Sequence, residues 1–405
     1  MILVLLNLLT PLRLNTDGIR YLNIVEYLNG ALGENSYAAH DFFPHGYPRF
    51  LQLLSKLNLL NGAVLTLINV ISTLAAAYLL TLILPVKNKL LFLSIVMLSF
   101  LNVKQFTLPI ADQLFTLIFT VGIYLWIRFF NGRWYWIIPA LLVTILAIYV
   151  RTAGIALMLG VIMCIVFHKR KSLLKSKPLV YCIGLVIIVA VALFLFNLVL
   201  IAKHVDYIRQ LELLKMVNEP ASIIDRLFLH FKELGELLIN LPYSKIASIT
   251  HINVVVISAL AIALGVIVMM VIVLSIRQLK LYNNLIFWVG LVYLAMIFVW
   301  PFYDTRFFTP VVPVLIYLVI HYLSSLKTNY LRVALFISYI TFGLISLLYS
   351  DALSLSRPYF LKHYGFDAGL TNAYRIHFGN KDNKRKPVYD INKDNYLYLL
   401  QLYDK

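Results

Sequence analysis

The first apolar segment of the sequence ends near a carboxylate, Asp17, in the stretch 15–21 with the sequence NTDGIRY. Apolar residues at every third position from 19 to 28 predict a helix here, and Thr16 or Asp17 could cap it by accepting backbone N–H bonds. Asp17 could instead be a general base, because a positioned carboxylate can take the proton of an attacking hydroxyl or amine. Position alone favours the cap, whereas the polar residues elsewhere in the sequence favour the catalytic role.

A second group of titratable residues follows in the stretch 38–48, AAHDFFPHGYP, which contains His40, Asp41 and His45. Two prolines, a glycine and three aromatic residues in this stretch predict a fixed, non-helical turn. The turn is either a surface turn in an aromatic belt at a membrane interface or one wall of an active site. In the second interpretation His40, Asp41 and Tyr47 line a substrate pocket.

Two arginines could bind an anionic group. Arg306 lies in the stretch 300–308, WPFYDTRFF, with Asp304 two residues before it and Tyr303 beside that acid. A guanidinium binds phosphate through two parallel hydrogen bonds, although Arg306 and Asp304 could also form only a local ion pair. Arg151 lies between two apolar runs, where it is either functional or extends to lipid headgroups.

Asp112 lies at the start of another apolar run, three residues after Pro109. Pro109 suits the first turn of a helix, and an acidic residue there interacts favourably with the helix dipole. Asp112 could equally project into a cavity above the membrane. Its capping and functional interpretations therefore both stand on the sequence.

The composition indicates what must position these residues. Of the 405 residues, 61% are hydrophobic and only 13% are charged, which is typical of a polytopic membrane protein and not of a soluble one. The formal net charge is +17, but much of the excess lies in short turns between apolar runs. No basic stripe accompanies a soluble domain, so the sequence predicts no nucleic-acid partner and membrane lipids as its surroundings.

We expect an all-α bundle of about eleven transmembrane helices, because lipid-exposed backbone is satisfied only in helices or closed barrels, and these runs are too long for barrel strands. The first run is short, about 21 Å as a helix, and lacks the basic start of a removed signal peptide, so we expect it to be retained. The predicted spans are Met1–Leu14, Ala63–Leu84, Leu90–Val103, Leu114–Phe130, Tyr135–Val150, Gly154–Phe167, Leu179–Ile201, Val254–Ile276, Leu285–Trp300, Phe307–Leu323 and Leu331–Tyr349.

Lysine and arginine occupy every second short loop, and the positive-inside rule therefore places those loops and the N-terminus in the cytoplasm. The remaining loops, including 15–61 and 203–253, face outside, and all the candidate residues lie on that side. Residues 1–349 form the predicted membrane module, and residues 350–405 a polar outer-face tail that is either a small cap or a flexible end. An amphipathic pattern over 223–238, with a capping box at Ser222 and Asp225, predicts a helix in the interface plane.

Four short motifs resemble those of GT-C glycosyltransferases, most closely the lipid A aminoarabinose transferases and the protein O-mannosyltransferase group. Residues 17–28 resemble the D-x-x-R-Y-x-x-I-x-x-x-L start of their first outer loop, and residues 43–48 resemble the P-x-G-Y-P element that ends it. Residues 151–154 resemble R-P-x-G, with Thr152 in place of proline. Residues 303–313 resemble a late D-x-R-[YF] segment before a proline-containing helix.

The resemblance implies an integral membrane enzyme, in a bacterial inner membrane, with its active site facing the exterior. It would move a sugar from a polyprenyl-phosphate carrier to an acceptor that is a lipid, a glycan or a protein. Asp17 would be the catalytic carboxylate and Arg306 a donor-phosphate residue, with Arg151 as the second candidate. Arg20, Tyr21, Tyr303 and Asp304 would lie in the substrate pocket. Gly18 occupies a position where many members have a second acid, so a divalent metal is not indicated, and no other cofactor is.

Two other function classes share parts of this pattern. A lipid or sugar transporter would also use interior charges, but it should show inverted repeats and charges near the membrane midplane, whereas here the charges gather at one face. A polysaccharide polymerase or ligase shares the lipid-linked donor and differs in the glycan it transfers. Both alternatives remain open on the sequence.

Overall fold

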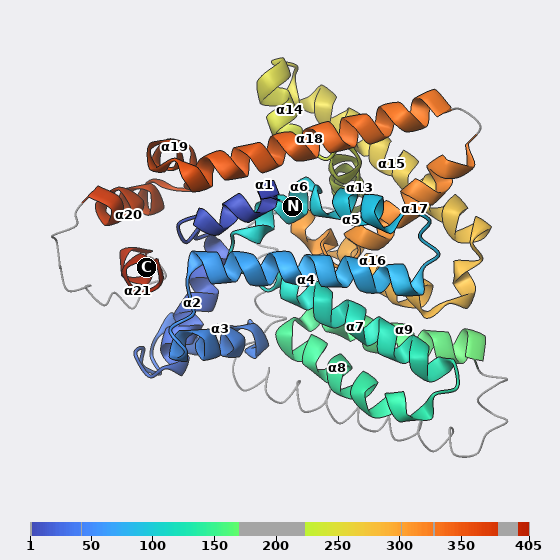
Figure 1. Ribbon diagram of the computed structural model, residues 1–405, viewed down its shortest axis with the longest axis horizontal. Coiled ribbons are helices and arrows are strands. Elements are labelled where there is room, and N and C mark those ends of the chain that lie inside the picture. Colours follow the sequence, from blue (N-terminus) through green and yellow to red (C-terminus); the bar gives the residue numbers. More distant parts are fainter. Residues whose placement is uncertain are drawn as a thin grey trace.

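We describe the protein from a computed structural model, which places residues 2–41, 43–169, 223–300, 302–326, 329–379 and 396–404. In these ranges every regular element is a helix (Figure 1). The first half contains α1 (Ile2–Leu6), α2 (Thr16–Leu28), α3 (Gly46–Lys56), α4 (Gly62–Ile83), α5 (Lys89–Met97), α6 (Phe100–Phe106), α7 (Asp112–Phe130), α8 (Ile137–Val150) and α9 (Ile155–Cys164). The second half contains α13 (Ile223–Ile239), α14 (Tyr243–Thr250), α15 (Val254–Gln278), α16 (Leu285–Val299), α17 (Val312–Ser325), α18 (Asn329–Leu355), α19 (Arg357–His363), α20 (Ala368–Gly379) and α21 (Tyr396–Tyr403). Short turns of 3-10 helix or π-helix are η1 (Asn7–Leu9), η2 (Tyr37–His40), η3 (Trp134–Trp136), η4 (Thr152–Gly154), η5 (Ile165–Lys169), η6 (Leu281–Asn283) and η7 (Thr305–Phe308).

Four of the described helices are long and apolar enough to cross a membrane: α4, α7, α15 and most of α18. A fifth candidate is the pair α5 and α6, bent by 62° at a short break. Shorter apolar helices cover 134–150, 152–167, 285–299 and 312–325. The helices are compatible with an integral membrane protein, but the described chain has four or five full spans, not the eleven expected. The predicted span Leu179–Ile201 lies outside the described residues.

The prediction of a span at Met1–Leu14 is wrong. The helix α1 ends at Leu6, and after η1 the chain is extended up to the start of α2. Pro11 has no N–H for a helix ladder. Arg13 is buried, and its guanidinium donates to the Ser350 hydroxyl at 3.0 Å, the Ser350 carbonyl at 2.7 Å and the Ser354 hydroxyl at 2.7 Å. Hydrogen bonds to the end of α18 therefore hold this segment. The apolar pattern of residues 1–14 could not predict these bonds, because their partners are distant in the sequence.

The bend between α5 and α6 is fixed from a distant part of the chain. The Asn240 side chain, just after α13, accepts from the backbone N–H of Phe100 at 2.6 Å and donates to the carbonyl of Leu98 at 2.9 Å. These bonds satisfy backbone groups that the break frees from the helix ladder. The predicted span Leu90–Val103 is consequently two short helices.

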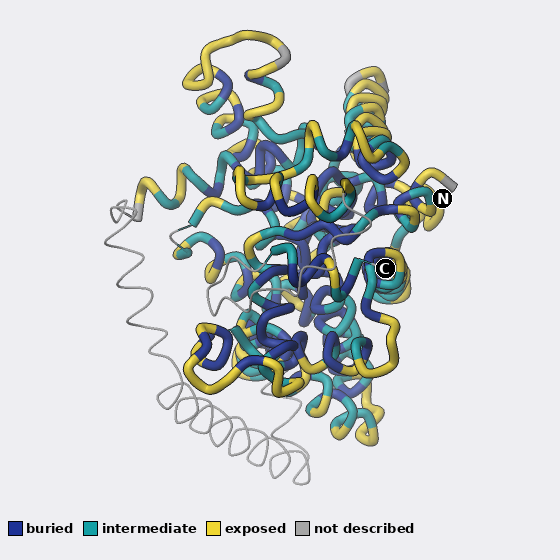
Figure 2. Tube along the Cα trace, turned by 90° about the vertical axis from the view of Figure 1, so that its left-hand side faces the viewer, coloured by how far each residue is buried: buried dark blue, intermediate teal, exposed yellow. Residues whose placement is uncertain are grey.

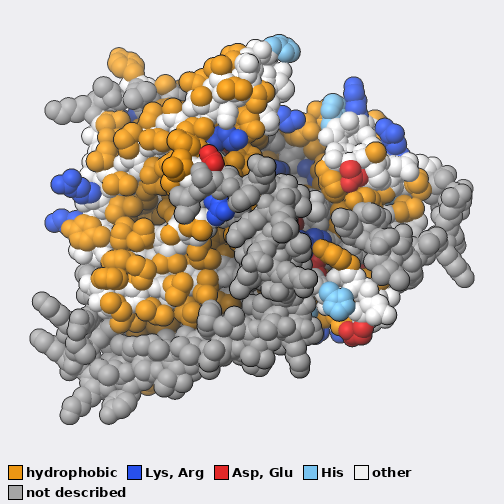
Figure 3. All heavy atoms as spheres, turned by 180° about the vertical axis from the view of Figure 1, so that it is seen from behind, with side chains coloured by type: hydrophobic (Ala, Val, Ile, Leu, Met, Phe, Trp, Pro, Cys, Tyr) orange, Lys and Arg blue, Asp and Glu red, His pale blue; other side chains and the backbone are white. Residues whose placement is uncertain are grey.

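The long helices lie roughly side by side, and α2, α3 and α19 to α21 gather at one end of the bundle, on the left in Figure 1. We call this the α2 end. The turns that carry Lys87 and Arg133 lie at the opposite end. Figure 3 shows hydrophobic side chains over the middle of one face and lysine or arginine side chains at its left edge. In Figure 2 the buried residues concentrate where the helices meet.

The described part of residues 350–405 folds against the N-terminal segment. Tyr374 is fully buried, and its hydroxyl accepts from the backbone N–H of Leu14 at 2.8 Å and donates to the carbonyl of Leu12 at 2.7 Å. The carboxylate of Asp404 accepts from the N–H of Leu12 at 2.7 Å. The helices α19 to α21 therefore support the segment that leads into α2.

Candidate active site

Asp17 lies in the first turn of α2, but it does not cap the helix. The cap is Asn15, whose side-chain oxygen accepts from the backbone N–H of Gly18 at 2.8 Å. A Cβ at Gly18 would lie 2.6 Å from the Pro109 ring, so a residue without a side chain is needed for α2 to pack on the loop before α7. The expected helix is confirmed, whereas the capping interpretation of Asp17 is wrong and its carboxylate is left for another role.

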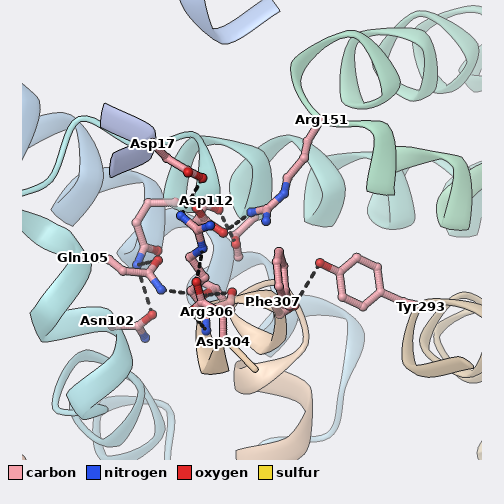
Figure 4. Close-up of polar contacts among 12 residues, drawn as sticks. Asp17, Asn102, Gln105, Asp112, Arg151, Tyr293, Asp304, Arg306 and Phe307 are labelled. Atoms are coloured by element: carbon pink, nitrogen blue, oxygen red, sulfur yellow. Dashed lines mark hydrogen bonds and ion pairs between the residues drawn. The ribbon is translucent and has the colours of Figure 1, made fainter. Parts of the chain in front are cut away.

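That carboxylate pairs with Arg306. Nη1 of Arg306 lies 2.7 Å from Oδ2 of Asp17, and Nε lies 2.6 Å from Oδ2 of Asp304, so one guanidinium joins two acids (Figure 4). Asp304 also accepts from the backbone N–H of Arg306 at 3.1 Å and thereby caps η7. Burial lowers the pKa of Arg306, but Asp17 and Asp304 more than offset this and raise it overall. The pair with Asp304 is local, as the sequence allowed, whereas the pair with Asp17 joins two segments that are far apart in the sequence.

A second arginine reaches the same place from α8. Arg151 follows the last residue of α8 and forms a short ion pair with Asp112, the first residue of α7 (Figure 4). The Phe307 ring lies 5.5 Å from the Cζ atoms of both Arg151 and Arg306, within cation–π range. Asp112 makes no side-chain capping bond, and Pro109 lies in the loop before α7, not in its first turn. The structure therefore brings together both candidate phosphate-binding residues.

Arg20 and Asp41 form a fourth ion pair, and Arg20 also interacts electrostatically with Asp17. Nε and Nη2 of Arg20 donate to the two carboxylate oxygens of Asp41 at 2.8 and 2.7 Å, a bidentate arrangement. The guanidinium lies 3.8 Å from the centre of the Phe43 ring, and Asp41 also accepts from the N–H of Phe43 at 3.0 Å. This pair ties α2 to the turn before α3.

Phe43 and Tyr47 of the stretch 38–48 pack on α2. The Tyr21 ring lies 4.7 Å from that of Phe43 and 4.9 Å from that of Tyr47, which is almost fully buried. The stretch is not wholly non-helical, because α3 begins at Gly46 and Pro48 lies in its first turn. A Cβ at Gly46 would overlap the carbonyl oxygen of Tyr149, so the glycine brings α3 against the end of α8 beside Arg151.

Two of the predicted pocket residues lie elsewhere. His40 ends η2 and is exposed, and among the described residues it forms no ion pair with the acids of the site, although it directly precedes Asp41. Tyr303 is 38% exposed and turns toward α13, where Lys232 lies 4.4 Å from the centres of both the Tyr303 and the Tyr243 rings. Tyr303 thus borders the site on its α13 side.

Sequence reasoning missed a chain of buried amides beneath the site. Gln105 of α6 donates to the Thr309 hydroxyl at 2.8 Å, and Gln113 of α7 donates to Asn102 at 3.1 Å and to Gln105 at 3.3 Å. Thr73 of α4 donates to Gln113 at 2.7 Å. These bonds connect α4, α6 and α7 to the segment after η7 (Figure 4). The sequence does contain a signal for this chain, namely amide side chains within apolar runs. Buried amides require hydrogen-bond partners, so such residues predict a polar contact inside the bundle.

The cluster combines guanidinium groups, a type that binds phosphate, with carboxylates, a type that can take a proton. Its arginines are partly exposed, with 20% of the Arg306 side chain and 14% of the Arg151 side chain accessible, and Asp17 is 19% accessible. In the described ranges no three His, Cys, Asp or Glu side chains lie close enough together to hold a metal ion. The chemistry available from these residues is therefore phosphate binding by guanidinium and proton transfer by carboxylate.

Searches against protein-family models, curated proteins and solved structures find no match for this chain.

Proposed function

We propose that the chain is a membrane glycosyltransferase, which takes a sugar from a polyprenyl-phosphate donor and transfers it to a hydroxyl or amine acceptor. The observation that carries the proposal is the contact between Arg306 and Asp17, at 2.7 Å and partly open to solvent. A cation suited to a lipid phosphate thus lies directly beside a carboxylate suited to be a base. The resemblance of residues 17–28 and 303–313 to GT-C motifs supports the same assignment.

The ion pair suggests how donor binding prepares the base. A donor phosphate offers Arg306 a bidentate partner that competes with the carboxylates of Asp17 and Asp304. Once Arg306 turns to the phosphate, Asp17 is free to accept a proton. Arg151, whose Cζ lies as close to the Phe307 ring as that of Arg306, is the second cation at the site, and the two arginines together stabilise the charge of the leaving phosphate.

In the reaction, an acceptor oxygen or nitrogen forms a bond to the anomeric carbon as the bond between that carbon and the phosphate oxygen breaks. The bonding electrons leave with polyprenyl phosphate, whose charge the arginines stabilise. The acceptor proton passes to Asp17. Nothing is oxidised or reduced, and these steps use only side chains of the described site.

The placement of the charges favours a transferase over a transporter. The four ion pairs lie at the starts of α2 and α7, after η2, at the end of α8 and at the start of η7, that is, at helix ends near the α2 end. A transporter binds substrate near the membrane midplane between broken helices. We accordingly propose that the α2 end faces the exterior of a bacterial inner membrane, where a lipid-linked donor meets its acceptor.

Purified protein in lipid nanodiscs can test the assignment. The nanodiscs are loaded with polyprenyl-phosphate sugars extracted from the host membrane, an acceptor fraction is added, and polyprenyl phosphate release is measured by mass spectrometry. We expect release with the wild-type chain and none with Asp17→Asn. Equal release from both proteins, or none from either with every extracted donor and acceptor fraction, would count against a transferase.

A further inference from the structure

The helix α13 presents a line of polar side chains to the loop that leads into η7. Residues three or four positions apart share one face of a helix. On α13 that spacing joins Arg226, His230, Glu233 and Glu236, of which the last three are buried. Ser222, the first residue of the predicted capping box, lies outside the described residues.

The same face binds the last residue of α16 and two residues of the loop that follows it. Nη1 of Arg226 donates to the carbonyl of Val299 at 3.0 Å, and Nε2 of His230 lies 2.8 Å from the carbonyl of Trp300. Further along, the Tyr303 hydroxyl faces the Glu236 carboxylate. Side chains of α13 therefore bind the residues just before Asp304 and Arg306.

α13 is itself rigidly placed. A Cβ at Gly235 would overlap the carbonyl oxygen of Ala261, and one at Gly265 would overlap that of Phe231. The helices α13 and α15 are thus in backbone contact at both glycines. A loop that binds α13 is therefore fixed relative to the other helices of the bundle.

His230 and Glu233 must share a proton. Both side chains are inaccessible to solvent, and Nδ1 of His230 lies 2.6 Å from Oε2 of Glu233. A carbonyl can only accept, so the Nε2 atom facing Trp300 carries a hydrogen. The short contact on Nδ1 then needs one more proton, either on the imidazole or on the carboxyl group.

Few charges face this pair. Burial raises the pKa of Glu233, an effect that the contacts of its carboxylate with His230 and with the N–H of Asp304 only partly offset. α15 and α16 present apolar surface here, such as the Phe298 ring 5.7 Å from that of His230. The titratable or charged neighbours are Arg226, Lys232 and Glu236 on α13, Tyr243 on α14, and Tyr303 and Asp304 on the loop.

We propose that His230 and Glu233 are positioning residues whose shared proton lets α13 hold the 299–304 loop, and with it Arg306, in place. The contact between α13 and the loop does not depend on the proposed transfer reaction. Only its consequence for donor binding by Arg306 rests on the proposed function. When the proton leaves, a lone pair on Nδ1 faces a carboxylate, and the repulsion opens the pair. The loop then loses its contact at Trp300.

The sign of the pH dependence follows from the raised pKa. A carboxyl group whose pKa is higher in the folded protein stabilises it most below the ordinary value of 4.5, and this contribution is lost as the pH rises through the folded value. Protection of the loop should therefore decline, by at most about tenfold per pH unit, as the pH rises from 4.5 to the raised pKa of Glu233, and it should level off above that pKa.

Hydrogen exchange of the intact chain in nanodiscs, without donor, tests this directly. Protection factors of the peptide 299–308 are compared across pH for wild type, Glu233→Gln and the exposed control Glu34→Gln. The amide that Glu233→Gln introduces can donate to Nδ1 without a titrating proton, so we expect protection that no longer varies with pH, whereas the control should follow wild type.

A wild-type protection factor that is flat with pH would overturn the proposal, and that result needs no folded variant. The same decline in wild type and Glu233→Gln would also overturn it. The protection of the loop could vary with pH as expected in a protein that consumes no lipid-linked sugar. That result would support the contact between α13 and the loop and would reject only the transferase assignment.

Discussion

Asp17 and Arg306 are the two residues on which the proposed chemistry depends, and the structure joins them although 289 positions separate them in the chain (306 minus 17). The sequence identified each of them separately, from its residue type and from its place beside an apolar run. It could not show that Arg306 serves Asp17 and Asp304 together. Neither could it show that Asn15 caps α2, since capping side chains are common at several neighbouring positions.

Replacing Asp17 by asparagine should separate chemistry from folding. Asn15 remains the helix cap, so we expect thermal unfolding close to that of wild type, whereas loss of a positioned base costs roughly 10²- to 10⁴-fold in rate. Transfer rate and melting temperature are measured side by side for Asp17→Asn and Asp17→Ala. An Asp17→Asn protein that retains full activity would remove Asp17 from the mechanism.

Arg306→Lys should weaken donor use, because a single ammonium group cannot replace the guanidinium fork that reaches two partners. The loss of one charged hydrogen bond corresponds to roughly 1.5–3 kcal/mol. The measurement is the apparent affinity for the polyprenyl-phosphate donor. Arg49→Lys, an exposed arginine of α3, is the matched control and should leave that affinity unchanged. Identical affinities for the two variants would move the phosphate site elsewhere.

At the scale of elements, apolar patterning located most of the helices but not their interruptions. α4, α7, α15 and α18 match predicted spans because each is a long run without an internal break. The N-terminal segment and the α5–α6 bend departed from the prediction because Arg13, Asn240 and their distant partners outweigh local apolarity. α13 illustrates the same limit. Its apolar pattern predicted a helix. Its close packing on α15 and its hydrogen bond to Trp300 depend on tertiary contacts, which the pattern does not predict.

The contact between α3 and α8 gives a test at this scale. Gly46→Ala would place a methyl group inside van der Waals contact of the Tyr149 carbonyl oxygen, a backbone atom that cannot move aside easily. We expect a loss of stability of about 1–3 kcal/mol, as for other overpacked sites. Gly33→Ala, which meets no atom within 4 Å, is the control. Thermal unfolding in detergent compares them, and equal melting temperatures would show that this contact does not form.

At the scale of the molecule, the expected orientation follows from the loops rich in lysine and arginine, and the structure puts two of those loops opposite the α2 end. Single-cysteine variants can test this in intact cells. With the native cysteines replaced, a cysteine at position 35 should react with an impermeant reagent and one at position 278 should not. Labelling at 278 but not at 35 would place the candidate site on the cytoplasmic side.

The proposed function requires that the chain use a lipid-linked sugar. Its most direct test is mass spectrometry of polyprenyl-phosphate sugars in cells that lack the chain or express wild type, Asp17→Asn or the Gly33→Ala control. We predict that one such lipid accumulates in cells without the chain and in cells with Asp17→Asn, and that wild type and Gly33→Ala both remove it. The same set of lipid-linked sugars in all four strains would contradict the proposed function.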